Sequence, residues 1–211
     1  MLFRSGTIKK NGVMGTIGCT SFFPSKNLGC YGDGGAMFSN DDILADRLKK
    51  IANHGQSKRY YHDEVGCNSR LDTIQAAVLD IKLNHLDEYI NARRAVADFY
   101  NKAFANHPKI TIPFCAEYTK HVFHQYTILL EGGDQSAAYR NGLVDFLASY
   151  NIPSMIYYPV PAHRQKMFAN FGGNQAKLKT TDWLTERVVS LPIHTEMDTE
   201  QLDFITDKVL E

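Results

Sequence analysis

Residues 20–36 read TSFFPSKNLGCYGDGGA, and they place one lysine, Lys26, between two short apolar segments. The hydroxyl pair Thr20-Ser21 and two phenylalanines precede the lysine, and a loop with four glycines follows it. Glycines let a backbone approach a ligand closely. The Ser21 hydroxyl suits a phosphate oxygen, and an apolar wall that desolvates Lys26 would make its amine nucleophilic toward a carbonyl. A surface turn with a solvated lysine stays open as the alternative, because the glycine spacing matches no phosphate-loop motif.

Two segments resemble the DegT/StrS family of pyridoxal-phosphate-dependent sugar aminotransferases. They are SFFPSKNLGCYGDGGAMFSND at 21–41 and HGQSKRYYHDEVGCNSRLDTIQAAVL at 54–79. The resemblance implies an α/β protein of aminotransferase fold type I. Residues 1–105 would be the C-terminal part of the large cofactor domain with a long linking helix, and residues 106–211 the small C-terminal α/β domain. It also implies pyridoxal 5'-phosphate as the cofactor, bound covalently by Lys26 and through its phosphate by Ser21.

The second segment carries two further site residues by the same resemblance. Asn68 matches the family asparagine that reaches the cofactor phosphate of the neighbouring subunit, which implies a homodimer with a shared active site; a turn asparagine is the alternative. Arg70 matches a family arginine near the sugar, where its guanidinium would form a bidentate pair with a carboxylate, through two hydrogen bonds. A salt bridge to Asp72 or Asp33 is the alternative for Arg70.

The segment YYPVPAH at 157–163 matches a family segment that borders the substrate pocket. Tyr158 and His163 are therefore implied to bind substrate, by stacking on or hydrogen-bonding with a nucleotide sugar. Packing within the small domain is the alternative for both residues.

The implied reaction is transamination of a nucleotide-linked keto sugar in surface-polysaccharide synthesis. The Lys26 motif is most similar to that of enzymes that aminate the 3-keto position of a UDP-linked 2-acetamido hexuronic acid, with glutamate as the amino donor. Amination at C4 of a UDP- or dTDP-linked keto sugar is the near alternative. A dehydratase of the same scaffold is disfavoured because that branch replaces the lysine by histidine. A binding or oligomerisation module without activity is the third alternative.

Family members carry roughly a further 150 residues before this point, enough for most of a domain. Those residues include the aspartate that pairs with the pyridine nitrogen of the cofactor. We therefore expect the chain of 211 residues to be inactive alone. We also expect it to expose a sheet edge and apolar patches.

Composition excludes several other classes. The 23 basic and 23 acidic residues cancel, so bulk charge favours neither nucleic acid nor a membrane surface. The four cysteines lack metal-finger spacing, the histidines show no ligand pattern, and no metal is expected. Reduced thiols, the lack of a secretory leader and the lack of a membrane-length apolar run favour the cytoplasm.

The periodicity of apolar residues and the positions of helix- and strand-breaking residues predict the following elements. A buried strand over 16–23 pairs with a strand over 36–39, and a cap at 40–42 begins a helix that ends by Gly55. A loop over 56–70 precedes a long helix over 71–105 that bends near Asn84 or Asn91. The second domain has strands at 110–112, 124–130 and 154–158, and helices at 142–150 and 199–210.

Overall fold

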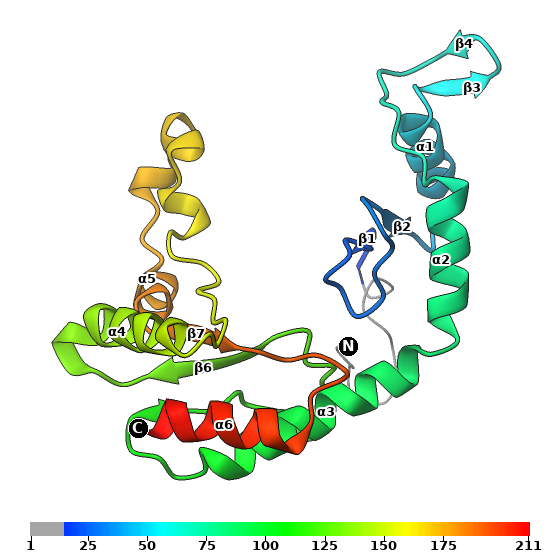
Figure 1. Cartoon of the computed structure of the whole chain (residues 1–211). Helices are drawn as coiled ribbons and strands as arrows, with labels where there is room; N and C mark the ends of the chain where they lie inside the picture. Colours follow the sequence, from blue (N-terminus) through cyan, green and yellow to red (C-terminus); the bar gives the residue numbers. More distant parts are fainter. Residues whose placement is uncertain (1–14) are drawn as a thin grey trace. The chain divides into compact units, whose positions relative to one another are not determined.

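The structure is a computed structural model that describes residues 15–211, and these form two compact units (Figure 1). Unit 1 comprises residues 15–91 and 115–122, and unit 2 comprises residues 92–114 and 123–211. Helix α3 (Leu86–Ala103) belongs to unit 1 up to Asn91 and to unit 2 from Ala92. The domain boundary after residue 105 stays a prediction.

Unit 1 begins with a two-stranded ribbon. Strand β1 (Gly18–Ser21) pairs antiparallel with β2 (Gly35–Phe38), with Thr20 opposite Ala36, as predicted. The predicted burial of the first strand is wrong for the described chain, because every residue of β1 after Gly18 is exposed. Two strands alone cover little of either sheet face, so apolar side chains such as Met37 stay in contact with solvent.

The next elements of unit 1 follow local signals. Asp41 caps α1 (Asp42–Ala52), as predicted, because its Oδ1 accepts hydrogen bonds from the N–H groups of Ile43 (2.9 Å) and Leu44 (3.0 Å). A hairpin of β3 (Gln56–Lys58) and β4 (Tyr61–His62) occupies part of the predicted loop. At Gly55, where φ is +70°, a Cβ atom would lie 1.7 Å from the carbonyl oxygen of Glu64, so only glycine fits.

The predicted long helix is two helices. Helix α2 (Thr73–Leu83) ends before Asn84, and α3 begins at Leu86. The bend near Asn84 is therefore confirmed. Within the described residues no helix is both long enough and apolar enough to cross a membrane.

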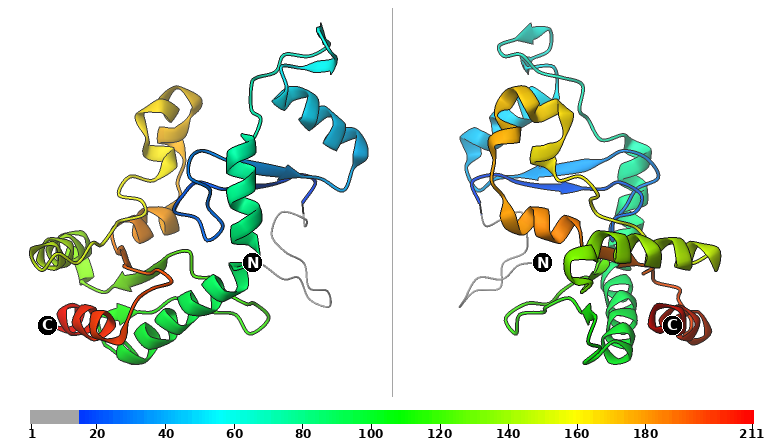
Figure 2. Two further views of the ribbon diagram at one scale, coloured as in Figure 1. Left: turned by 45° about the vertical axis from the view of Figure 1, so that its right-hand side comes forward. Right: turned by 90° about the vertical axis from the view of Figure 1, so that its left-hand side faces the viewer.

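Unit 2 is a three-stranded antiparallel sheet with helices on both faces (Figures 1 and 2). Its strands, in the order β5-β6-β7, are β5 (Ile110–Thr111), β6 (Tyr126–Leu130) and β7 (Val188–Leu191). Helix α4 (Ser136–Ser149) covers one face, while α3 and α6 (Thr199–Leu210) cover the other. The remaining helices are α5 (Lys179–Thr185) and the short 3-10 helices η1 (Gly133–Gln135), η2 (Ala162–Arg164), η3 (Lys166–Phe171) and η4 (Gly173–Gln175).

The main hydrophobic core lies in unit 2. Alternate residues of β6 are buried, as expected for a strand with one face on a core. All four residues of β7 are buried, although this strand ends the sheet and has only the Met155 bridge on its other side. The largest fully buried side chains include Tyr100, Phe104, Tyr126, Ile128 and Leu147. Burial raises the pKa of the Tyr100 phenol, whose hydroxyl donates to the carbonyl oxygen of Pro192 at 2.8 Å.

The predicted strand over 154–158 is wrong. Only Met155 pairs with β7, through a single bridge in which its N–H and C=O groups bond to Ser190 at 3.1 and 2.7 Å. Pro153 precedes this bridge and Pro159 follows it. Because proline has no N–H group to donate, Pro153 cannot continue the pairing on the N-terminal side of the bridge.

Removal of the α6 cap is expected to destabilise unit 2 by about 1 kcal/mol. The Oδ1 atom of Asp198 accepts a hydrogen bond from the N–H of Gln201 at 2.8 Å, and the Gln201 side chain accepts one from the N–H of Asp198 at 3.3 Å. Asp198→Ala breaks this capping box, and urea unfolding measures the loss. The control Asp203→Ala changes an exposed residue of the same helix. Equal stability of the two variants would contradict the prediction.

Candidate active site

Lys26 and Ser21 lie on either side of one tight turn that follows β1. The N–H of Lys26 donates to the carbonyl oxygen of Phe23 at 2.9 Å, and the lysine is half-buried. Ser21 ends β1, is exposed, and its Oγ accepts from the N–H of Phe23 at 3.2 Å. A hydroxyl that accepts this bond still has its own proton to donate. The turn therefore offers an amine and a hydroxyl donor, the two groups predicted for a phosphate-bearing aldehyde.

Two residues of helix α2 form hydrogen bonds with the glycine loop that follows the lysine. The Nζ of Lys82 donates to the carbonyl oxygen of Gly29 at 2.8 Å and lies 4.6 Å from the centre of the Tyr31 ring. The Oε1 of Gln75 accepts from the N–H of Tyr31 at 2.7 Å. Sequence reasoning missed both α2 residues. Their spacing of seven, which places two residues on one helix face, was the available signal.

Close packing explains one of the loop glycines. A Cβ atom on Gly34 would lie 2.9 Å from the Sγ of Cys30 and 3.1 Å from the Cδ1 of Leu71. The Cys30 thiol is buried and lies 3.0 Å from the carbonyl oxygens of both Phe22 and Gly32. In this structure, the cysteine is therefore a structural element of the loop.

Asn68 and Arg70 lie on a second segment, attached to the C-terminal end of α1. The backbone N–H of Ser69 donates to Ala52 at 2.9 Å, and Asn68 forms a bridge with Asn53. The Nη1 of Arg70 donates to the Oδ1 of Asn53 at 3.2 Å, and Arg70 is exposed.

The predicted alternative for Arg70, a salt bridge to Asp72 or Asp33, is absent among the ion pairs of residues 15–211. Arg70 therefore has a neutral partner and no carboxylate in the described chain. Asn68 and Arg70 stay predicted site residues.

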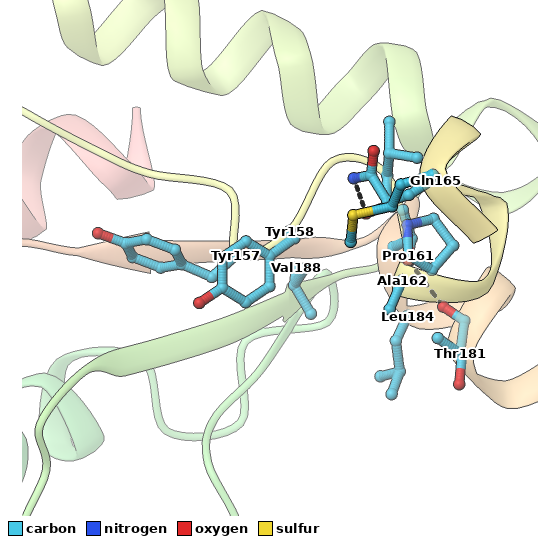
Figure 3. A pocket seen from close by; sticks show the side chains of 11 residues that line it. Tyr157, Tyr158, Pro161, Ala162, Gln165, Thr181, Leu184 and Val188 are labelled. Atoms are coloured by element: carbon cyan, nitrogen blue, oxygen red, sulfur yellow. Dashed lines mark hydrogen bonds between the residues drawn. The ribbon is translucent and has the colours of Figure 1, made fainter. Parts of the chain in front are cut away.

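Tyr158 lies at a pocket of about 470 Å³ in unit 2, a volume typical of small-molecule sites (Figure 3). The rings of Tyr157 and Tyr158 meet edge to face, with centroids 5.5 Å apart. None of the 11 described residues that line this pocket carries a charge. They are Tyr157, Tyr158, Val160, Pro161, Ala162, Gln165, Met167, Thr181, Leu184, Thr185 and Val188.

His163 belongs to the same segment but is not one of the lining residues. Its side chain is only 8% exposed, and its Nε2 lies 3.2 Å from the Oδ1 of Asp182 on α5. Asp182 is a residue that sequence reasoning missed. Within residues 15–211 no cluster of histidine, cysteine, aspartate and glutamate is arranged to hold a metal ion.

Comparison with known proteins places these features in a family. The family model of DegT/DnrJ/EryC1/StrS aminotransferases matches residues 5–210. Relatives include a pleiotropic regulatory protein of Geobacillus stearothermophilus, 40% identical over 95% of this chain and 52% of its own length. Another is the UDP-2-acetamido-2-deoxy-3-oxo-D-glucuronate aminotransferase of Pseudomonas aeruginosa, 41% identical over 93% of this chain and 52% of its own length.

A solved structure of a DegT DnrJ EryC1 StrS aminotransferase from Brucella abortus is 37% identical, with a TM-score of 0.83 over 94% of this chain and 51% of that chain. The chain spans about half the length of the relatives that it matches. The predicted fold class, that of the pyridoxal-phosphate-dependent aminotransferases, is confirmed.

The cofactor of this family is pyridoxal 5'-phosphate, as predicted. The donors around the turn fit it, because Lys26 supplies a half-buried primary amine for an aldehyde and Ser21 an exposed hydroxyl for a phosphate. This chain belongs to the DegT/DnrJ/EryC1/StrS aminotransferase family.

Proposed function

We propose that this chain carries the lysine-bearing part of a pyridoxal-phosphate-dependent transaminase that acts on a nucleotide-linked keto sugar. The observation that carries the proposal is the turn of Ser21 and Lys26, in a chain whose family match runs from residue 5 to residue 210. The homodimer, with Asn68 reaching the partner's cofactor phosphate, and the cytoplasmic location remain predictions.

The proposed roles follow from the chemistry of each side chain. The cofactor, when bound, withdraws electrons from the substrate carbon that bears nitrogen. The Nζ of Lys26 would hold the cofactor through its aldehyde, with release of water, and as a free amine would move a proton to and from that carbon as a general acid and base. Ser21 donates its hydroxyl proton to a phosphate oxygen. The hydrogen bond from Lys26 N–H to Phe23 fixes the turn, so the amine and the hydroxyl keep their relative orientation.

We assign the unit 2 pocket to an uncharged part of the substrate. Its lining is apolar and aromatic, with only the hydroxyl and amide groups of Tyr157, Tyr158, Gln165, Thr181 and Thr185 to form hydrogen bonds. A diphosphate or carboxylate placed there would lose hydration without meeting a cation. Tyr158 accordingly contacts the sugar or the base, and the charged groups are held elsewhere.

The proposed substrate is a UDP-linked 3-keto-2-acetamido hexuronic acid with glutamate as the amino donor. The Pseudomonas aeruginosa relative, named for such a sugar, supports this choice. Arg70 is exposed and bonded to one neutral amide oxygen, so its guanidinium retains donors for the sugar carboxylate. Transaminases of dTDP-linked sugars are also among the relatives and support the alternative substrate class. The name of the Geobacillus relative supports a regulatory role as a further alternative.

The test follows the transfer of ¹⁵N from labelled glutamate to the sugar by mass spectrometry, with the holoenzyme, two UDP-linked 3-keto-2-acetamido sugars and one dTDP-linked keto sugar. One UDP-linked sugar carries a carboxylate at C6 and the other a hydroxymethyl group. Arg70→Gln is expected to lower kcat/KM for the acidic sugar about 10- to 100-fold, because a hydrogen-bonded charge pair is lost. The rate on the neutral sugar is expected to change little.

An equal effect of Arg70→Gln on both sugars would contradict the carboxylate contact. Label transfer to a dTDP-linked keto sugar alone would replace the proposed substrate with the alternative. No transfer to any nucleotide-linked keto sugar would overturn the proposed function.

A further inference from the structure

Asp182 of α5 joins two consecutive residues of η2. Its Oδ1 lies 3.2 Å from the Nε2 of His163, and its Oδ2 accepts a hydrogen bond from the Nη2 of Arg164 at 2.9 Å. The hydrogen bond from Arg164 holds the pKa of the Asp182 carboxyl below its usual value, and the charge of Arg164 and the contact with His163 lower it further. Asp182 is therefore a carboxylate at neutral pH and attracts both partners.

The two partners of Asp182 differ in exposure. The Arg164 side chain is 50% exposed, so solvent screens its half of the cluster. The His163 side chain is 8% exposed, and the carboxylate that faces its Nε2 lies on another element. The His163 contact is therefore the part of the cluster that solvent replaces least readily.

The cluster joins two segments that line the unit 2 pocket. On η2, the neighbours of His163 and Arg164 in sequence, Ala162 and Gln165, both line the pocket. On α5, Thr181, next to Asp182, lines the pocket as well. Figure 3 shows Ala162, Gln165 and Thr181 around the same cavity. Asp182 therefore connects two segments that contribute residues to the lining of the same cavity.

We propose that Asp182 and His163 form a positioning pair that fixes the η2 wall against the α5 wall and so sets the fit of the substrate's uncharged part. His163 then acts through Asp182 and does not touch the substrate. This inference rests on the proposed function, because it assigns the pocket to a nucleotide-linked keto sugar. It changes the sequence prediction for His163 from a substrate contact to a positioning residue and adds Asp182 to the site.

The first experiment compares Asp182→Asn with the unchanged holoenzyme, using UDP-2-acetamido-2-deoxy-3-oxo-glucuronate as the substrate. KM is expected to rise about tenfold, since the carboxylate that contacts His163 and accepts the hydrogen bond of Arg164 is lost, while kcat stays within about twofold. Asp182→Glu restores a carboxylate and is expected to recover most of the affinity. The matched control is Glu186→Gln, which removes an exposed carboxylate next to the end of the same helix. An unchanged KM in Asp182→Asn would overturn the proposal.

His163→Gln separates positioning from direct contact. The amide of glutamine places an N–H donor near the position of the His163 Nε2, so it can still reach Asp182 but lacks the ring. Retention of KM within about threefold is expected if His163 acts only through Asp182. A rise in KM for His163→Gln that matches or exceeds that of Asp182→Asn would show direct contact and overturn the proposal.

Amide hydrogen exchange of the same variants gives a readout that needs no activity. Asp182→Asn is expected to speed exchange at Arg164 and Gln165, whose N–H groups donate within η2 to Pro161 and Ala162. Exchange in β6 and β7 is expected to stay unchanged. Unchanged exchange at both η2 amides would overturn the positioning pair. If the unchanged enzyme aminates no nucleotide-linked keto sugar, the proposed function fails, while the exchange result still decides whether Asp182 holds the wall.

Discussion

Replacing Lys26 by alanine is expected to abolish covalent capture of pyridoxal phosphate and to lower the transaminase activity of the holoenzyme by about a thousandfold or more. The side chain is half-buried in the turn after β1, and the proposed chemistry uses its Nζ twice, to bind the aldehyde and to move a proton. Borohydride reduction of the chain mixed with pyridoxal phosphate, followed by peptide mapping, measures the capture directly.

The matched control for this experiment is Lys49→Ala. Lys49 is an exposed lysine of α1, and its loss is expected to leave capture at Lys26 unchanged. Capture of the cofactor by Lys26→Ala at the level of the unchanged chain would contradict the assignment. A labelled peptide other than the one that contains Lys26 would contradict it as well.

The elements that sequence predicted well are those with local signals. Helix α6 covers residues 199–210 as predicted, because a capping aspartate precedes a regular apolar pattern. The β1–β2 pairing is local too, since one glycine-rich loop joins its strands. The cap of α1 at Asp41 needs only the residues two and three positions later in the chain.

The features that sequence missed depend on distant partners. Strand β7 has four residues and is stabilised by pairing with β6, about 60 positions earlier in the chain. The single bridge at Met155 depends on that same strand. The prediction of a buried first strand was wrong. The apolar residues of the predicted segment indicate a buried strand, but whether a strand is buried depends on what covers it, and β1 is exposed.

The residues of the candidate site also fall into two groups, those identified from local sequence and those that depend on distant partners. Ser21 and Lys26 can be predicted as site residues from the sequence, because they are close to each other in the chain and lie in a segment that resembles the family. Asp182 lies 19 positions after His163, in a helix without a motif, so only the folded chain brings the carboxylate to the imidazole. Gln75 and Lys82 contact the glycine loop across 44 and 53 positions, and their identities alone suggest only a polar helix face.

Leu147→Ala is expected to lower the free energy of unfolding of unit 2 by about 2–5 kcal/mol. Leu147 lies on α4, is 0% exposed and belongs to the core that also contains Ile128 and Leu202. The truncation removes apolar surface from the core and leaves a cavity that the rigid sheet does not fill. The backbone oxygen of Leu147 also accepts a hydrogen bond from the N–H of Ile152 at 3.0 Å, and this bond holds the segment after α4 at the helix end. Urea unfolding followed by circular dichroism measures the change.

The control Leu178→Ala makes the same truncation at a side chain that is 47% exposed in unit 2, where a loss of about 1 kcal/mol or less is expected. A third variant, Leu83→Ala, truncates a leucine of α2 in unit 1 that is 55% exposed. The described residues of unit 1 have few buried apolar side chains, so its effect on the main unfolding transition is expected to be small. If Leu147→Ala costs no more than these two exposed truncations, the cluster around α4 is not the main source of the chain's stability. A loss several times larger than either would show that the cluster around Leu147 is a main source of the stability of unit 2.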